Sequence, residues 1–514
     1  MSGAKLTPAE TAAAEAQAKV NACLDKGRSF RLEAGAGAGK TYSLVQALKR
    51  LIAERGPALM HAGQKVACIT FTEVAREEIA QEIEQHPAIL VETIHAFSWA
   101  FLSQFQKILR GLVEAMNDRQ DKIALGGGVG SKLVEYSLGF FGVDDERITL
   151  AHDDIPKFMA KLLGETKFRR LLAQQYPIIF IDEYQDTDQD FMEALSEHYF
   201  KAGEGPVIGL FGDHWQTIYR GDFDLADFPI EGIDKGSNFR SVPAIVNMLN
   251  RLRPELPQHV SDPDAVGEAR FFHANTYQGQ RTNTAHSKND LPDDVGREYR
   301  AALLGQLEAE GWDLSREKTK ILMLTHSALA TEQGYSSITT IFKRSEAFAK
   351  KEDPTLAFFA DTVEPMSRAY GLGRYGEMFR LMGEAPAIRS HADKLSWQQS
   401  MQTLDKLRLG GTVGNVLDHL KQTQRPRLAE RVMRREDELA RLQGAPVPEE
   451  ETSLHRHSQL RAVPYDEVIK LVRFVEGGTP MATQHSVKGA QFENVVVILG
   501  GGWKGLSGIS CAGP

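Results

Sequence analysis

The 514-residue sequence has few cysteines, no long apolar run and no excess of positive charge. Its three cysteines, Cys23, Cys68 and Cys511, are too few for a disulfide framework and too far apart for a metal-binding knuckle. No run approaches the roughly 20 apolar residues needed to cross a bilayer, and the first residues lack the order of a secretion signal. We therefore expect a cytoplasmic protein without a membrane partner.

The charge and the length set two further limits. A formal net charge of −9 excludes a global attraction to nucleic acid, so any such contact must come from a local groove. A single core rarely grows beyond about 250–300 residues, so a chain of this length is expected to form several domains.

Short apolar runs that are typical of buried strands recur, and each precedes a helix-like pattern. This alternation predicts an α/β fold with parallel sheets. Two stretches break the rhythm, residues 99–172 and 343–477, and we expect both to be mainly helical insertions. The predicted strands are residues 30–32, 66–70, 178–181, 207–211, 321–324 and 495–499.

Some polar features carry no clear function. Residues 276–294 are crowded with small polar side chains and predict a surface loop. His455 and His457 lack nearby cysteines and are predicted to face solvent rather than bind zinc. The basic residues between Lys406 and Arg441 alternate with acidic ones, so they either line a DNA path or form a solvated helical face.

A glycine-rich segment lies between the first predicted strand and an amphipathic helix. Its small residues let backbone N–H groups turn toward phosphate oxygens, Lys40 can reach the outer phosphates, and the Thr41 hydroxyl can bind Mg²⁺. The alternative, a glycine turn with a chance Lys-Thr pair, is disfavoured by the strand–loop–helix context. The predicted nucleotide-binding residues here are Ala34, Gly35, Ala36, Gly37, Ala38, Gly39, Lys40, Thr41 and Tyr42.

Two carboxylates, Asp182 and Glu183, end a later hydrophobic strand, where a parallel sheet presents its catalytic edge. Asp182 is predicted to hold Mg²⁺, and Glu183 to polarise the attacking water. An ordinary strand ending in an acidic turn is the alternative, and the phosphate loop makes it less favoured.

The residues Asp182-Glu-Tyr-Gln-Asp186 resemble the Asp-Glu-x-Gln-Asp box of the UvrD/Rep helicases, a superfamily-1 group. The resemblance extends along most of the chain. It implies ATP and Mg²⁺ as cofactors and two RecA-like P-loop motor domains with parallel sheets, each carrying a mainly helical insertion. The implied domains are motor domain 1A (1–98 and 173–236), insertion 1B (99–172), motor domain 2A (237–342 and 478–514) and insertion 2B (343–477).

The resemblance also assigns nucleotide contacts outside the loop. Gln17 stands where the family reads adenine, and Gln216 where it senses the γ-phosphate. In Asn238-Phe-Arg-Ser, Phe239 is the aromatic that stacks on adenine and Arg240 reaches the γ-phosphate from the second motor domain. Gln491 replaces the family's acidic contact to the nucleotide sugar, which keeps hydrogen bonding but loses charge.

DNA contacts are implied by four motifs. Residues 69–72 and 93–97 resemble the first two, although Glu73 stands where Asn is usual. Tyr219 would stack on a base, and because the chain is shorter after it than in the family, Phe223 is the candidate for a second stacking ring. His485 belongs to the last motif. The predicted DNA-binding residues are Thr70, Phe71, Thr72, Thr93, His95, Tyr219 and His485.

The family carries a further motif that supplies an arginine to the transferring phosphate, and the sequence as printed reaches Pro514 without one. We expect a truncated chain, and the alternative is a family member whose missing arginine is supplied by a partner or by Arg240 alone. ATP hydrolysis by this chain depends on which of these holds. Two functions follow. One is an ATP-dependent helicase or translocase moving 3′-to-5′ on single-stranded or partly duplex DNA in repair, recombination or phage defence. The other is an ATP- and DNA-binding subunit partnering a nuclease, as in Gabija-type defence.

Overall fold

The computed structural model describes residues 6–136, 141–216, 228–282, 289–323, 326–342, 348, 351, 353–383, 388–442, 452–483, 487 and 490–499. They form two compact units, one up to Phe271 and one from Phe272 onward. Tyr219, Phe223 and His485 lie outside the described residues. Within the described residues, no helix combines the length and apolar character that crossing a membrane requires.

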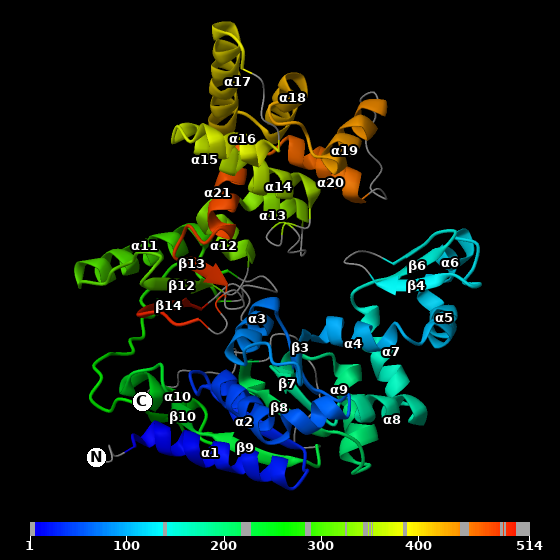
Figure 1. The fold of residues 1–514 in the computed structure, drawn as a ribbon. Coiled ribbons are helices and arrows are strands. Elements are labelled where there is room, and N and C mark those ends of the chain that lie inside the picture. Colours follow the sequence, from blue (N-terminus) through cyan, green and yellow to red (C-terminus); the bar gives the residue numbers. More distant parts are fainter. Residues whose placement is uncertain are drawn as a thin grey trace. The chain divides into compact units, whose positions relative to one another are not determined.

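The first unit (Figure 1) is built on a six-stranded sheet. The strand order is β3-β2-β7-β8-β1-β9, and every adjacent pair is parallel. The carboxyl ends of its strands therefore meet at one edge. This confirms the predicted α/β class with parallel sheets. The strands are β1 (Phe30–Ala34), β2 (Val66–Thr70), β3 (Ile89–Thr93), β7 (Ile178–Asp182), β8 (Val207–Gly212) and β9 (Glu231–Lys235).

Helices cover both faces of this sheet, which is why its central strands β2 and β7 are buried along their whole length. In β7, Ile178 and Phe180 belong to the core under α1, α2 and α3. Ile179 and Ile181 point to the opposite core, under α4, α7 and α9. The covering helices are α1 (Pro8–Asp25), α2 (Lys40–His61), α3 (Glu73–Glu82), α4 (Ile94–Leu102), α7 (Asp154–Leu163) and α9 (Gln189–Leu195).

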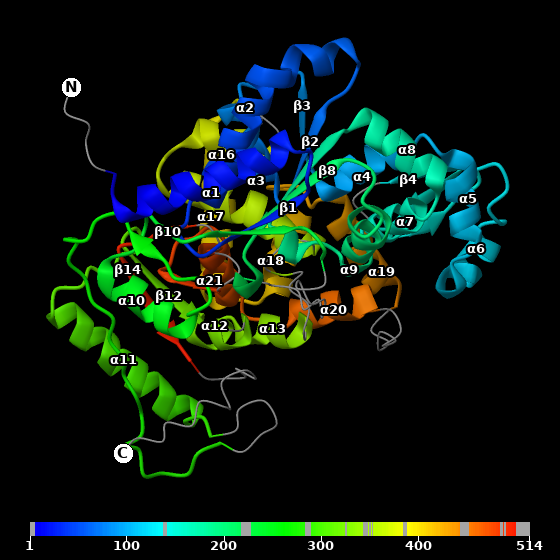
Figure 2. The ribbon, with the colours of Figure 1, turned by 90° about the horizontal axis from the view of Figure 1, so that it is seen from below.

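The segment 99–172 contains helices, as predicted, but also a small sheet in the order β4-β6-β5 that we did not predict. Its strands have only two to four residues, too few for a period-2 pattern to stand out. The sheet lies beside α5 and α6 at one end of the unit (Figure 2). The elements are α5 (Gln106–Glu114), η1 (Asn117–Arg119), α6 (Gln120–Leu125), β4 (Leu133–Tyr136), β5 (Gly142–Val143), β6 (Arg147–Leu150) and α8 (Thr166–Gln175).

The segment after β9 also belongs to the first unit. Its short parallel strands β10 and β11 pack with α1, so residues 237–260 are tied to the sheet that carries the phosphate loop. We predicted that motor domain 1A ends at residue 236 and that 2A begins at residue 237, directly before this segment. The domain boundaries stay a prediction. The remaining elements of the unit are η2 (Tyr184–Asp186), η3 (Ser196–Phe200), η4 (His214–Gln216), β10 (Ser237–Asn238), α10 (Pro243–Leu252) and β11 (His259–Val260).

The second unit has a parallel sheet in the order β13-β12-β14 and a helical body. The sheet joins β12 to two strands that follow the helices in the chain, and every described element between β12 and β13 is a helix. These elements are α11 (Asp293–Ala309), β12 (Thr319–Met323), α12 (His326–Gln333), α13 (Ser336–Phe342), α14 (Pro354–Phe358), η6 (Phe359–Val363), α15 (Glu364–Gly371), α16 (Tyr375–Met382), α17 (His391–Gly410), α18 (Val413–Thr423), α19 (Glu430–Arg441), α20 (Thr452–Arg461), α21 (Tyr465–Val475), β13 (Met481–Thr483) and β14 (Asn494–Ile498).

One prediction about the second unit is wrong. His457 is fully buried instead of facing solvent, and its imidazole contacts the Thr355 hydroxyl and the Glu436 carboxylate at 2.9 and 2.8 Å. Some basic residues of the 406–441 stretch are also structural, because Arg408 forms a two-bond ion pair with the buried Glu364. A partner from a distant helix offsets the desolvation cost of burying the His457 imidazole and the Glu364 carboxylate.

Candidate functional site

The glycine-rich segment forms a tight loop between β1 and α2. Gly37 and Gly39 adopt φ angles of 77° and 74°, in the left-handed region that favours glycine. The N–H of Ala38 donates to the Gly35 carbonyl at 3.0 Å, which closes the turn. A Cβ at Gly37 would lie 2.9 Å from Oδ1 of Asn238, so packing as well as backbone conformation requires glycine there.

Lys40, the first residue of α2, meets the end of β7. Its Nζ lies 2.6 Å from Oε2 of Glu183, and both side chains are largely buried, with 12% and 23% exposed. Burial opposes the charge on Lys40, but the carboxylates of Glu183 and Asp182 outweigh burial and raise its pKa. The lysine is therefore held as a cation between the phosphate loop and the two predicted catalytic carboxylates.

Glu183 adopts an unusual backbone conformation, with φ at 50° in the left-handed region. A non-glycine residue held there carries strain, and such residues gather at functional sites. Gln185 fixes the Glu183 side chain by donating from Nε2 to Oε2 at 2.6 Å. The backbone conformation of Glu183 and the hydrogen bond from Gln185 together orient the carboxylate.

Gln185 also links the end of β7 to the end of β8. Its Oε1 accepts a hydrogen bond from the N–H of Asp213 at 3.1 Å. Asp213 in turn accepts from Nε2 of Gln216 at 2.6 Å. A Cβ at Gly212 would lie 2.3 Å from Oε1 of Gln185, so this close approach needs glycine. Glu183 and Gln216 are thus joined through one chain of hydrogen bonds.

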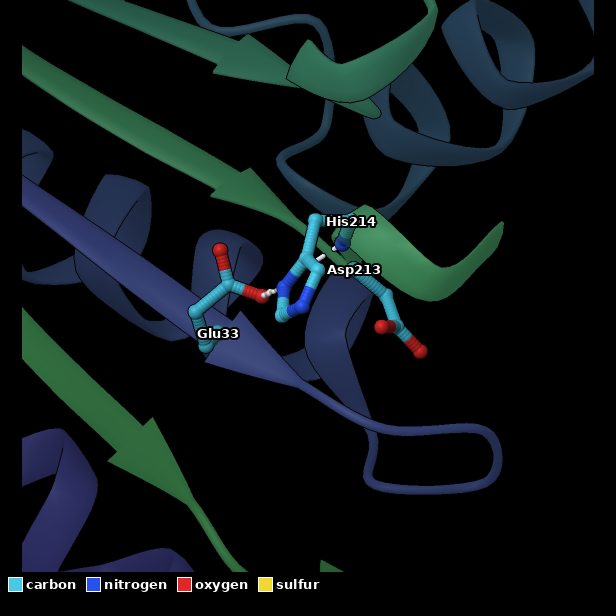
Figure 3. A group of neighbouring side chains, drawn as sticks. All are labelled: Glu33, Asp213 and His214. Carbon is cyan, nitrogen blue, oxygen red and sulfur yellow. Dashed lines mark hydrogen bonds and ion pairs between the residues drawn. The ribbon is translucent and has the colours of Figure 1, made fainter. Parts of the chain in front are cut away.

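A polar cluster of the buried Glu33 and Asp213 and the exposed His214 includes one member of this hydrogen-bond chain, Asp213. The ligand atoms of Glu33, Asp213 and His214 lie within 4.8 Å of one another (Figure 3). Arg253 occupies the cluster as its cation, with guanidinium nitrogens 2.6 Å from Asp213 and 3.6 Å from Glu33. Its guanidinium also lies over the Trp215 ring. Because an arginine already balances the two carboxylates, we do not assign a metal here.

Both predicted base-binding residues belong to the first unit. Gln17 is on α1, which packs against β9, β10 and β11. Its Nε2 donates to Asn21 at 3.3 Å, whereas its buried Oε1 has no hydrogen-bond partner among the described residues. The Phe239 ring lies close to Gly39 and is 42% exposed. Phe239 thus presents an accessible aromatic face, whereas the Gln17 amide oxygen is buried.

Arg240 and Gln491 fall in different units. Arg240 belongs to the first unit, and its N–H donates to Oδ1 of Asn238 at 3.0 Å. Gln491 is an exposed residue of the second unit, just before β14. The predicted contacts of Arg240 to the γ-phosphate and of Gln491 to the nucleotide sugar stay predictions.

The predicted DNA-contact residues of the first unit share one sheet edge. Thr70 and Thr93 are register partners at the carboxyl ends of β2 and β3. Thr72 and Thr93 are also N-caps, accepting from the backbone N–H groups of Ala75 and Ala96. Phe71 is 38% exposed. This edge therefore presents an aromatic ring and two ordered helix starts, and β2 lies directly beside β7, the strand that Glu183 follows.

His95 stacks on a residue of the insertion. The His95 and His152 rings are 3.4 Å apart and nearly parallel, and Nδ1 of His152 lies 2.6 Å from the Tyr136 hydroxyl. Burial, followed by the charge that His152 carries when protonated, lowers the pKa of His95 to about 4. Neutral His95 is therefore the form that the folded protein favours near pH 7.

The donor set fits Mg²⁺, the metal that the family implies. The candidate ligands are the hydroxyl of Thr41, next to Lys40, and the carboxylate of Asp182, which is 5% exposed at the end of β7. Hard oxygen ligands such as these suit Mg²⁺, which is commonly held by one or two protein groups together with substrate phosphates.

Three residues of this site received no role from the sequence. Gln185 lies inside the Asp-Glu-Tyr-Gln-Asp box, so the motif could have indicated it. Arg253 and Lys235 have no motif signal. Lys235 reaches the site because β9 pairs with β1, and Arg253 reaches it because the chain after α10 returns to Asp213.

Comparisons with known proteins show what the chain is similar to. Residues 17–222 match the AAA domain family. The chain is 23% identical to the Gabija protein GajB of Bacillus cereus (strain HuB5-5), over 68% of this chain and 62% of that protein. It is also 23% identical to an ATP-dependent helicase/nuclease subunit of Syntrophomonas wolfei, over 35% of this chain and 16% of the relative. RecBCD enzyme subunit RecB of Chlamydia pneumoniae is 27% identical over 20% of this chain and 11% of its own length.

The parallel sheet, the phosphate loop after β1 and the carboxylates after β7 define a P-loop nucleotide-binding fold. With the matched relatives, they make the chain similar to UvrD-like proteins of the superfamily-1 helicase group, in agreement with the resemblance of its motifs. The matched part spans less than two thirds of each of these relatives.

Proposed function

We propose that this chain is an ATP-driven motor that moves along DNA, in the cytoplasm, in repair or phage defence. The main support is the pairing of Lys40 with Glu183 at 2.6 Å, because it joins a phosphate loop to a carboxylate at the catalytic edge of the sheet. Lys40 would bind the outer phosphates, Thr41 and Asp182 would hold Mg²⁺, and Glu183 would orient the attacking water. The metal would neutralise charge on the phosphates.

Gln216 and Arg240 would act on the γ-phosphate, and Gln17 and Phe239 on the adenine. The bond from Gln216 to Asp213 supports the first role, because Asp213 is linked through Gln185 to Glu183. Loss of the γ-phosphate on hydrolysis would thus alter the hydrogen bonds at the end of β8. The chain continues from there into the segment that contains Tyr219. The finer role of each residue remains part of the proposal.

Single-stranded DNA is the proposed track, with 3′-to-5′ travel as the family resemblance implies. Thr70, Phe71, Thr72, Thr93 and His95 would contact it along the β2–β3 edge. The exposed Phe71 supports this, because a base can stack on any accessible aromatic face. Partly duplex DNA is the second proposed substrate.

A second function is favoured by one observation. The relative matched over most of this chain is named as a Gabija protein, and the other two are named as subunits. We therefore also propose a role as an ATP- and DNA-binding subunit whose partner is a nuclease or another protein. In that role DNA would regulate the complex, and unwinding by this chain would be weak or absent.

ATP hydrolysis with and without single-stranded DNA tests the motor function. We expect DNA to stimulate hydrolysis by the wild-type chain and Lys40→Ala to abolish it, while the exposed-site variant Lys49→Ala keeps wild-type activity. No stimulation in the wild-type chain, together with ATP binding and DNA binding, would favour the subunit function. A Lys40→Ala variant with full activity would contradict both.

A further inference from the structure

The carbonyl side of the phosphate loop is held by one neighbouring segment. Each of the four carbonyls of Ala36–Gly39 accepts a hydrogen bond from a residue of Lys235–Phe239, which runs from the end of β9 through β10. Gln258 adds a second donor to Ala36 at 3.2 Å. The four bonds are Lys235 Nζ to Gly39 O (2.7 Å), Ser237 Oγ to Ala38 O (2.9 Å), Phe239 N to Gly37 O (2.9 Å) and Asn238 Nδ2 to Ala36 O (3.1 Å).

This arrangement orients the opposite side of the loop. In a planar trans peptide, the C=O of one residue and the N–H of the next point in opposite directions. Holding the Ala36–Gly39 carbonyls toward the segment therefore turns the N–H groups of Gly37, Gly39 and Lys40 away from it. The N–H of Ala38 is the exception, because it closes the turn to Gly35. Successive N–H groups on one side of a loop form an anion-binding concavity.

Lys235 is an unusual member of this segment. Its side chain is 1% exposed and donates to two neutral oxygens, the Gly39 carbonyl and the Ser43 hydroxyl at 2.6 Å. Burial lowers the pKa of Lys235 to about 8, so the ammonium form still predominates at pH 7. A buried cation directly behind the loop favours an anion in front of it, because the low-dielectric surroundings screen its charge weakly.

We propose that Lys235 and Ser237 are positioning residues of the nucleotide site, holding the phosphate loop from behind in the conformation that binds a nucleoside di- or triphosphate. Lys235 also supplies a positive charge behind the loop, in addition to that of Lys40. This inference rests on the proposed nucleotide-binding function of the loop. It adds two residues to which neither the motifs nor the relatives assign a role.

Binding of fluorescently labelled ADP with Mg²⁺ tests the inference. We expect Lys235→Met to raise the Kd at least tenfold and Ser237→Ala to raise it roughly three- to tenfold, the ranges typical of a charged and a neutral hydrogen bond. Ser237→Thr keeps the hydroxyl and should bind within about twofold of the wild type. Asp234→Asn, an exposed change on the same strand, is the matched control.

Amide hydrogen exchange separates positioning from general destabilisation. In Ser237→Ala without nucleotide, exchange should become faster in a peptide covering residues 35–44 and stay unchanged in β2 and β7. If wild type binds ADP while Lys235→Met and Ser237→Ala both bind within twofold of it, the inference is wrong and the proposed function stands. If the wild-type chain binds no ADP, the proposed nucleotide-binding function is wrong, and the inference that rests on it is wrong as well. Should Lys235→Met not fold, the Ser237→Ala and Ser237→Thr pair decides alone.

Discussion

Nζ of Lys40 and Oε2 of Glu183 are 2.6 Å apart, although the two residues are separated by 143 positions in the chain. Lys40 begins α2 directly after the phosphate loop, and Glu183 follows β7 in a strained conformation. The same carboxylate oxygen accepts from Gln185. A nucleotide that reaches Lys40 therefore competes with Glu183 for the ammonium group, which ties phosphate binding to the position of the catalytic carboxylate.

Glu183→Gln should separate nucleotide binding from hydrolysis. The amide cannot act as a base and attracts Lys40 less strongly, so we expect kcat for ATP to fall about 10²- to 10⁴-fold while the nucleotide Kd stays equal or decreases. Steady-state hydrolysis and binding of labelled ADP measure the two quantities. Glu193→Gln, an exposed change on α9, is the control. A large rise in Kd without a loss of kcat would contradict the assignment of Glu183.

Gly212→Ala should disturb the link between β7 and β8. The added Cβ would lie 2.3 Å from Oε1 of Gln185 and 2.4 Å from the Tyr184 ring, and overpacking of this kind costs about 1–3 kcal/mol of unfolding free energy. Chemical denaturation measures the loss. Gly232→Ala is the matched control, since a Cβ on that glycine of β9 meets nothing within 4 Å. Equal stability of the two variants would refute the close approach of Gln185 to β8.

Arg253→Met should leave the carboxylates of Asp213 and Glu33 without their buried cation. The arginine side chain is 10% exposed, and removing one partner of such a pair costs about 3 kcal/mol, at the lower end of the buried range. Thermal and chemical unfolding measure the loss, with the exposed Arg251→Met as the control. The double variant Asp213→Asn with Arg253→Met should recover part of the lost stability, and strict additivity would argue against a direct pair.

The stacked histidines predict a pH dependence of stability. Because the pKa of His95 is lowered from about 6.5 to about 4, the unfolded chain binds more protons than the folded chain between these values. The stabilisation is therefore present above about pH 6.5 and is lost as the pH falls toward 4. We expect His95→Phe to reduce the decrease of unfolding free energy between pH 7 and pH 5, measured by denaturation at each pH. The exposed His61→Gln should leave that decrease unchanged.

The sequence predicted most of what depends on local pattern. All six predicted strands are present, with bounds within two residues, because buried parallel strands leave apolar runs that are visible without the fold. The β4-β6-β5 sheet was missed since strands of two to four residues have no periodicity to detect. His457 was misplaced because its burial depends on Glu436 and Thr355, which are brought to it by other helices.

The amino-acid sequence by itself determined the phosphate loop, the paired carboxylates and the helicase-like motifs, because each is a short run of residues whose chemistry depends on near neighbours. Only the tertiary structure decided which side chains meet there. The sheet order places β8 and β9 on the two sides of β1. That order carries Asp213 and Lys235 to the loop, while the return of the chain after α10 carries Arg253 to Asp213. These contacts join distant parts of the chain, and burial gives them their strength.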